Sequence, residues 1–309
     1  MAGAGLIVVA GEALVDLVPA PGETLAAHPG GGPFNTARAL GRLGRPVAYL
    51  GRVSTDRFGA RLAGLLAADG VRLDAHVRTA DPTTLALVEL DEHGTARYRF
   101  YTDGTAAAGL TETEALAALP ADAGYLHIGT LGIVLEPVAA ALEALARELH
   151  GRALVMLDPN VRPSILADPA SYRARLGRLL ARADVVKVSE EDLDWLAPGV
   201  PPRDAARALL DQGPAVVLLT LGGDGAVALT AGRATDVAAP AVDVVDTIGA
   251  GDAFSGGWLA WWSEQGLGRA ELGDVARVEA ATRFACRVAA RTCERAGATP
   301  PHRAELEPV

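Results

Sequence analysis

The chain has 309 residues, half of them hydrophobic, and a formal net charge of −10 at pH 7. This length suits one large α/β domain or two small ones, with enough apolar residues for a substantial core. The acidic balance argues against a nucleic-acid-binding surface, so we expect no nucleic acid partner.

The N-terminal apolar stretch carries no basic segment before it and is interrupted by Glu12 and Asp16. We therefore expect neither a signal peptide nor a membrane span, and no membrane partner. Cys286 and Cys293 lie seven residues apart in an expected helix, and packing as small core residues is favoured over a disulfide or a zinc site. A cytoplasmic location is the expectation.

Hydrophobic patterns predict alternating strands and helices along the chain. Strands are expected at 6–10, 46–52, 125–128, 153–157, 216–219 and 242–245, helices at 35–44, 56–69, 136–150, 254–262 and 274–295, and a strand running into a helix at 184–192. Residues 226–229 and 234–237 are expected to pair as a short hairpin.

A second hairpin is predicted from the alternating runs Thr83–Leu90 and Thr95–Tyr101. Asp91-Glu92-His93-Gly94 separates them, with Gly94 in the turn. An antiparallel hairpin inserted among βα units usually forms a structure separate from the main sheet.

Glycines precede the helix expected at 35–44, which Gly44 ends. Gly31, Gly32 and Asn35 would bring backbone and amide groups close to a substrate. Asn35 could instead be only a helix N-cap.

Polar residues follow two of the expected strands, and ligands bind at strand ends in open parallel sheets. Asp158, Asn160 and Arg162 follow one of them. Arg162 could steady substrate or phosphate, or could merely pair with a neighbouring carboxylate. Lys187, the single lysine among 28 basic residues, is close enough to contribute charge towards a phosphate. The presence of only one lysine, at this position, could also be chance.

The most informative stretch is Asp246-Thr-Ile-Gly-Ala-Gly-Asp-Ala-Phe-Ser-Gly-Gly257. A strand, a glycine turn and a helix in this order leave several amides pointing at one spot, which attracts anions. A carboxylate beside such a spot would repel an anion, so Asp252 makes sense as a base that accepts a proton from a hydroxyl attacking a phosphoryl group. Alternatively, Asp252 is an idle carboxylate stabilised by the helix dipole.

Residues 246–257 closely resemble the C-terminal signature of the ribokinase-like (phosphofructokinase-B) sugar kinases, and residues 30–37 resemble the N-terminal signature. The two stand in the expected order, and the similarity runs from Leu6 to about Pro301. The resemblance implies an α/β three-layer sandwich with a central, mostly parallel sheet, formed by one domain over residues 1–309. It also implies a small β-sheet lid, with strands inserted at about 12–30 and 82–104, that closes over the sugar and forms the contact of a homodimer.

The resemblance assigns roles residue by residue. Asp252 is the base, and the backbone of Gly249, Ala250 and Gly251 forms the anion hole. Asp16 binds sugar hydroxyls, since a carboxylate can accept two such bonds from a vicinal diol; a turn-forming Asp at a strand end is the alternative. The other sugar-binding positions are Gly31, Gly32, Asn35 and Arg162.

At the nucleotide end, Thr220, Gly222 and Gly225 resemble residues that line the ATP site. Ser189 and Asp192 stand where many relatives have Asn-x-x-Glu, a pattern linked to magnesium and phosphate, so this departure weakens any claim about the metal. Lys187 and Ser189 are nevertheless assigned to the nucleotide. Backbone carbonyls near Asp246, Ile248 and Gly297 are implied to bind a monovalent cation, K⁺ being the candidate.

The resulting hypothesis is an ATP- and Mg²⁺-dependent kinase that converts fructose to fructose 6-phosphate, because residues 11–16, 99–106 and 158–163 look most like those of fructokinases. A 2-keto-3-deoxygluconate kinase, which must hold a carboxylate, is the main alternative, beside other sugar kinases of the family. Arg97 and Arg99 alternate with Tyr98 and Phe100, so the arginines are expected to face away from the sugar. A non-catalytic sugar- or nucleotide-binding protein is the alternative of another class, and the intact Gly-Ala-Gly-Asp argues against it.

Overall fold

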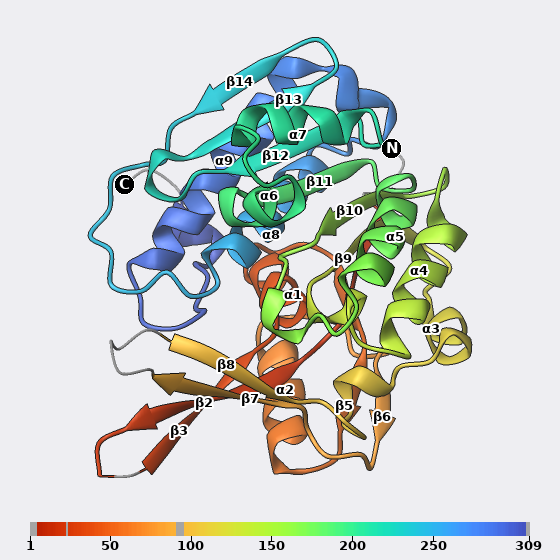
Figure 1. Ribbon diagram of the computed structural model, residues 1–309, viewed down its shortest axis with the longest axis vertical. Helices are drawn as coiled ribbons and strands as arrows, with labels where there is room; N and C mark the ends of the chain where they lie inside the picture. The colour runs from red at the N-terminus through yellow and green to blue at the C-terminus, as the bar shows by residue number, and fades with distance from the viewer. Residues whose placement is uncertain (1–4, 23, 91–95, 307–309) are drawn as a thin grey trace.

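A computed structural model describes residues 5–22, 24–90 and 96–306, and its largest feature is an eight-stranded sheet in the order β14-β13-β12-β11-β10-β9-β1-β4 (Figure 1). The strands are β1 (Leu6–Ala10), β4 (Val47–Leu50), β9 (Ala123–Gly129), β10 (Leu154–Asp158), β11 (Val185–Ser189), β12 (Val216–Thr220), β13 (Ala226–Thr230) and β14 (Ala234–Val237). The strands β12, β11, β10, β9, β1 and β4 run parallel to one another. The hairpin β13–β14 adds an antiparallel edge beside β12. The predicted mostly parallel α/β sheet is confirmed.

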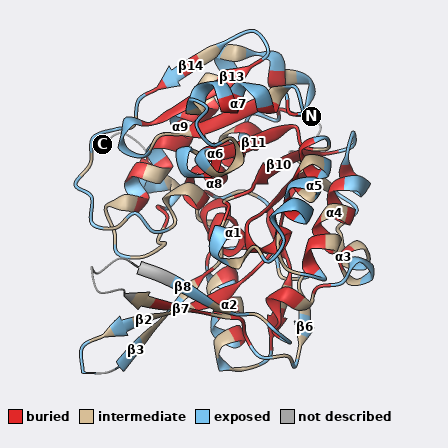
Figure 2. Ribbon diagram, in the orientation of Figure 1, coloured by how far each residue is buried: buried red, intermediate tan, exposed pale blue. Residues whose placement is uncertain are grey.

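Helices cover both faces of this sheet, because both faces of its inner strands are apolar. On β1, Ile7 and Val9 pack into one core and Val8 into the other. The first core includes α1 (Gly32–Arg42), α2 (Arg57–Ala68), α8 (Ala250–Glu264) and α9 (Val275–Cys293). The second includes α3 (Glu112–Ala118), α4 (Val138–Leu149), α5 (Pro169–Leu180), α6 (Glu190–Leu196) and α7 (Pro202–Leu210). Figure 2 shows the buried residues concentrated on the sheet and on the inner sides of these helices.

Two adjacent glycines let α8 pack closely between α1 and α9. A β-carbon at Gly256 would lie 2.8 Å from that of Ala39 on α1. One at Gly257 would lie 2.9 Å from a methyl group of Val288 on α9. These contacts leave no room for larger side chains, so Gly256-Gly257 fixes the position of the helix that carries Asp252.

A second, four-stranded sheet projects beside the large one, in the order β3-β2-β7-β8 (Figure 1). Its strands are β2 (Leu14–Ala20), β3 (Thr24–Gly30), β7 (Leu85–Leu90) and β8 (Ala96–Tyr101). The hairpins β2–β3 and β7–β8 are joined by parallel pairing of β2 with β7. The predicted turn at residues 91–94 lies outside the described residues. A two-stranded pair, β5 (Arg52–Ser54) and β6 (Val77–Thr79), lies nearby.

The strand predicted at residues 242–245 is wrong, because this segment has no strand partner. The side chains of Val244 and Val245 are each 63% exposed. The amides of Val245 and Asp246 donate to the carbonyl of Cys293, at 2.8 and 3.1 Å. Carbonyls in the last turn of a helix have no partner within it, so the segment is bound to the end of α9 instead of to the sheet.

No helix in the described ranges is both long and apolar enough to cross a bilayer.

Candidate active site

A cavity of about 850 Å³ opens between the small sheet and the carboxyl ends of the parallel strands. The predicted site residues that line it are Asp16, Gly31, Gly32, Asn35, Arg162, Lys187, Ser189, Thr220, Gly222, Ile248, Gly249, Gly251 and Asp252. Its walls do not include Ala250, Gly225, Asp246 or Gly297, within the part of the chain that is described. Residues distant in the sequence thus converge where strands β1, β9, β10, β11 and β12 end.

The N-terminus of α8 faces this cavity with its first backbone amides. Gly249 is the N-cap, with φ of 78°, and a β-carbon there would lie 2.6 Å from that of Ala298. Among the described residues, no acceptor is found for the amides of Gly251 and Asp252. Free amides at the start of a long helix form an anion site.

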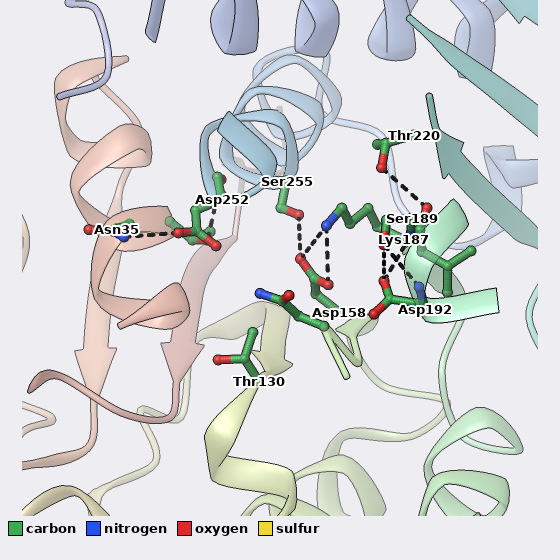
Figure 3. A network of polar contacts seen from close by, with 12 residues as sticks. Asn35, Thr130, Asp158, Lys187, Ser189, Asp192, Thr220, Asp252 and Ser255 are labelled. Carbon is green, nitrogen blue, oxygen red and sulfur yellow. Dashed lines mark hydrogen bonds and ion pairs between the residues drawn. The ribbon is translucent and has the colours of Figure 1, made fainter. Parts of the chain in front are cut away.

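Asp252 lies in the first turn of α8 and is 9% exposed. Its Oδ2 accepts a hydrogen bond of 2.9 Å from Asn35 Nδ2 on α1, and it does not cap its own helix (Figure 3). Burial raises the pKa of Asp252 to about 7; the Asn35 hydrogen bond and Lys187 oppose the shift, whereas Asp158 and Glu12 add to it. Gly31 is the N-cap of α1, so the interpretation of Asn35 as a mere N-cap is wrong.

Asp16 faces the cavity from within β2, not from its end, so its interpretation as a turn-forming strand-end residue is wrong. A β-carbon at Gly30, on the paired strand β3, would lie 2.1 Å from Asp16 Oδ2. The glycine therefore leaves space for the carboxylate. Burial raises the pKa of Asp16 to about 6.

Tyr98 and Phe100 line the cavity from β8 of the small sheet. Arg99 lies between them in sequence and pairs instead with Glu89, its Nε 2.9 Å from Oε1. This agrees with the predicted alternation for Arg99; the side chain of Arg97 lies outside the described residues.

Lys187 and Asp158 form a buried ion pair beside α8, with Nζ 3.2 Å from Oδ2 (Figure 3). Asp158 is 1% exposed and also accepts from Ser255 Oγ at 3.4 Å. It therefore lies beneath the cavity and not in its lining, contrary to the expectation for this strand end. A β-carbon at Gly251 would lie 3.0 Å from Lys187 Nζ, so the ammonium sits directly against the anion site.

Ser189 and Asp192 join the end of β11 to α6 through a capping box. Ser189 donates from N and Oγ to Asp192 Oδ2, each at 2.8 Å, while Asp192 Oδ1 accepts from Val161 N at 2.7 Å. Asp192 thus links Ser189 to the loop after β10, and of the two residues only Ser189 lines the cavity.

Arg162 makes no ion pair within the described ranges; its Nη1 donates to the carbonyls of Asn160 and Val161. Asn160 has φ of 39°, in the left-handed region that non-glycine residues seldom adopt. This turn places Arg162 at the cavity wall, where its guanidinium pairs with no carboxylate of the described residues. The alternative of a simple pair with a carboxylate is not what the structure shows.

The turn after β12 places two of its three predicted nucleotide residues in the cavity, Thr220 and Gly222. Gly225 shapes the turn instead: its φ is 104°, and a β-carbon would lie 2.1 Å from the carbonyl oxygen of Val237.

Asp246, Ile248 and Gly297 are brought together by the Asp246 carboxylate. It accepts from the amide of Ile248 at 3.0 Å and from that of Gly297 at 2.8 Å. The described residues contain no cluster of three or more His, Cys, Asp or Glu side chains that could hold a metal ion.

Glu12 is the site residue that sequence reasoning missed. It follows β1, is 2% exposed, lines the cavity and accepts from Gly32 N at 3.3 Å, Gly132 N at 3.0 Å and Thr130 Oγ1. Burial raises its pKa to about 7, although these hydrogen bonds oppose the shift. A carboxylate two residues after a buried parallel strand was the available signal, but Glu12 entered the sequence analysis only as an interruption of the apolar run and within the fructokinase-like segment 11–16.

Comparisons with known proteins place this chain in a family. A model of the pfkB family of carbohydrate kinases matches residues 4–304. The chain belongs to this family. The family confirms the predicted enzyme class, a carbohydrate kinase, and the ribokinase-like fold.

A fructokinase of Rhizobium leguminosarum bv. trifolii is 39% identical over 259 residues, which cover 82% of this chain and 79% of that protein. The crystal structure of fructokinase from Vibrio cholerae O395 in fructose, ADP and calcium ion bound form has a TM-score of 0.87 and 30% identity, over 98% of this chain and 97% of that one. Fructokinase with bound ATP from Xylella fastidiosa has a TM-score of 0.89 and 30% identity, over 97% of each chain.

The raised pKa of Asp252 predicts a pH-dependent stability. An unfolded aspartate titrates near pH 3.9, so the folded state binds this proton more tightly and loses stability as pH rises from about 4 to about 7. Asp252→Asn removes the titrating group. We expect the free energy of unfolding of the wild type to fall relative to the variant by up to about 1.4 kcal/mol per pH unit in this window. Urea unfolding at several pH values measures the difference, and parallel curves would contradict it.

Proposed function

We propose that this pfkB-family kinase transfers the γ-phosphoryl group of ATP to fructose, giving fructose 6-phosphate and ADP. The observation that carries the proposal is one cavity with Asp16 and Asn35 in its walls. There the amides of Gly251 and Asp252, which have no acceptor among the described residues, adjoin the Asp252 carboxylate. Such a cavity supplies an anion site, a base and groups that bind hydroxyls, which together suit phosphoryl transfer.

In the proposed reaction, the oxygen of the sugar hydroxyl forms a bond with the γ-phosphorus. The bond from that phosphorus to the bridging oxygen of ADP breaks, and ADP leaves with the electron pair. The hydroxyl proton passes to Asp252, whose pKa of about 7 is high enough for a useful base and low enough for ionisation at neutral pH. The amides at the start of α8 stabilise the charge that develops on the phosphoryl oxygens.

The sugar is proposed to lie between the small sheet and α1. Asp16 would accept hydrogen bonds from two hydroxyls, while Asn35, Gly31 and Gly32 border the sugar from the start of α1. Tyr98 and Phe100 cover this part of the cavity. A lid that excludes water protects the phosphoryl group from hydrolysis.

The nucleotide is proposed to extend from Gly251 past Lys187 and Ser189 to Thr220 and Gly222, which line the cavity. Mg²⁺ usually keeps several waters and is held through substrate phosphates and few carboxylates. The absence of a three-residue metal cluster among the described residues fits this mode. Glu190 and Glu191 are the carboxylates that line this end and could meet its water shell; when bound, the ion would neutralise phosphate charge.

A monovalent cation, K⁺ being the candidate, is proposed beside the anion site. The fit rests on Asp246, whose carboxylate joins the backbone at Ile248 and Gly297 and so brings together two segments with carbonyl groups. Its role would be to fix the loop that leads into α8.

A second copy of the chain is proposed to pair through the outer face of the small sheet. Side chains alternate between the faces of a strand, so Leu25 and Tyr101 lie on the face opposite Asp16 and Phe100. They are 52% and 51% exposed, so this face carries apolar surface that a second copy could cover.

Replacing Asp252 by Ala should lower turnover of ATP and fructose by about 10²- to 10⁴-fold, because the proton would have no acceptor. Binding of fructose and ATP, measured by calorimetry, should persist. Asp274→Ala is the matched control, since Asp274 also lies at the start of a long helix, where it caps α9 far from the cavity. It should retain turnover, and normal turnover by Asp252→Ala would refute the proposed base.

A substrate panel tests the choice of sugar. With ATP, kcat/KM should be highest for fructose and lower for ribose, glucose and 2-keto-3-deoxygluconate, since Arg99 is turned away from the cavity and paired with Glu89. Asp16→Asn should raise KM for fructose more than it lowers kcat. A higher kcat/KM for 2-keto-3-deoxygluconate would contradict fructose as the substrate and support the alternative kinase. No turnover of any sugar would favour a non-catalytic binding protein.

Pairing through the small sheet is tested by sedimentation. Leu25→Asp or Tyr101→Asp should convert a dimer into a monomer, because each buries a charge in the proposed contact. Val200→Asp is the control, as Val200 is 41% exposed and lies before α7, away from that sheet. A monomeric wild type, or a dimer unaffected by both changes, would contradict the proposed pairing.

A further inference from the structure

The buried Lys187 ammonium lies near three carboxylates but contacts only one of them. Lys187 is 5% exposed, and its Nζ lies 3.2 and 3.4 Å from the two oxygens of Asp158. Asp192 and Asp252 are close enough to act on its charge; burial lowers the pKa of Lys187, but the three carboxylates together raise it. The ammonium is therefore charged, and its position depends on which carboxylate holds it.

Asp158 is anchored to the same helix as the proposed base. Its Oδ2 accepts from Ser255 Oγ at 3.4 Å, and Ser255 stands three residues after Asp252 on α8 (Figure 3). Residues three apart lie on the same side of a helix. Asp158, anchored one turn along the helix from the base, thus holds the ammonium against Gly251, the residue next to the base.

The other two carboxylates differ in their freedom to accept a bond from Lys187. Asp192 already accepts from Ser189 and from Val161 N. Asp252 accepts a single hydrogen bond from the described part of the chain, that of Asn35, so it has lone pairs to spare. Without Asp158, the ammonium would turn to Asp252.

We propose that Asp158 is a positioning residue that holds the Lys187 ammonium against the anion site and keeps it from pairing with the base Asp252. This inference rests on the proposed function. A base paired directly with an ammonium is a weaker proton acceptor, because the opposite charge favours its ionised form. An ammonium drawn to the base would also leave the place where the transferred phosphoryl group develops charge.

The experiment compares pH profiles of kcat/KM for fructose with saturating ATP. The groups that face Asp252 from the elements around it are Glu12 after β1, Asn35 on α1, Asp158 on β10 and Lys187 on β11. In Asp158→Asn, the acid limb should move to lower pH by about one unit or more, and kcat at pH 8 should fall about tenfold or more.

Asp184→Asn is the matched control. Asp184 is likewise a buried aspartate beside β11, 6% exposed and paired with Arg269 at 2.7 Å, but it precedes the strand and lies at its far end from the cavity. Its loss should lower the thermal midpoint without moving the acid limb. A merely structural role of Asp158 would give this same result for Asp158→Asn and would overturn the proposal.

The double variant Asp158→Asn/Lys187→Met separates two effects of Asp158: its positioning of Lys187 and the direct effect of its charge on the pKa of Asp252. If Asp158 acts by holding Lys187, the shift caused by Asp158→Asn should be less than half as large in a Lys187→Met background. An equal shift in both backgrounds would overturn the proposal. If Asp158→Asn does not fold, Asp158→Ser serves in the same comparison.

The failure of this inference is distinct from that of the proposed function. The latter fails if the wild type does not phosphorylate fructose or if Asp252→Ala is fully active. The role of Asp158 is judged from the acid limb of the pH profile of kcat/KM, measured only in variants that phosphorylate fructose.

Discussion

The hydrogen bond from Asn35 to Asp252 is the interaction on which the site depends, because it joins the starts of two helices that the sequence places far apart. Thr36 adds a second link, from Oγ1 to the carbonyl of Asp252 at 3.3 Å. The close packing of Gly256 on Ala39 makes these bonds possible, since a larger residue would move α8 away from α1. Packing in the core thus sets the geometry of the proposed sugar and phosphate sites together.

The second constraint is electrostatic. Three carboxylates lie close together and are each at least nine-tenths buried: those of Glu12, Asp158 and Asp252. The Lys187 ammonium lies beside them and pairs with Asp158. Burying charges is costly unless they are paired or hydrogen-bonded. Glu12 is satisfied by backbone amides and a hydroxyl, and Asp158 by Lys187. Burial raises the pKa of Asp252, as it does that of Glu12, and a raised pKa suits the proposed base.

Much of this arrangement could be predicted from local patterns. Period-two alternation located the hairpin β7–β8, continuous apolar runs located the parallel strands, and glycines beside an aspartate located the start of α8. The strand predicted at 242–245 was wrong because alternation alone does not show whether a partner strand exists. The amides of Val245 and Asp246 bind the end of α9 instead. The partner of Asn35 and the burial of Asp158 could not be predicted, since both depend on contacts between distant segments. Glu12 carried a signal, its place two residues after a buried strand, that was not used as an indication of a site.

The central claim is that fructose and the transferred phosphoryl group meet at Asp252. A crystal structure with fructose and a non-hydrolysable ATP analogue tests it most directly. We expect the sugar's 6-hydroxyl oxygen within hydrogen-bonding distance of an Asp252 oxygen, about 2.6–3.2 Å, with the γ-phosphate on the amides of Gly251 and Asp252. A sugar bound elsewhere, or a γ-phosphate distant from the start of α8, would contradict it.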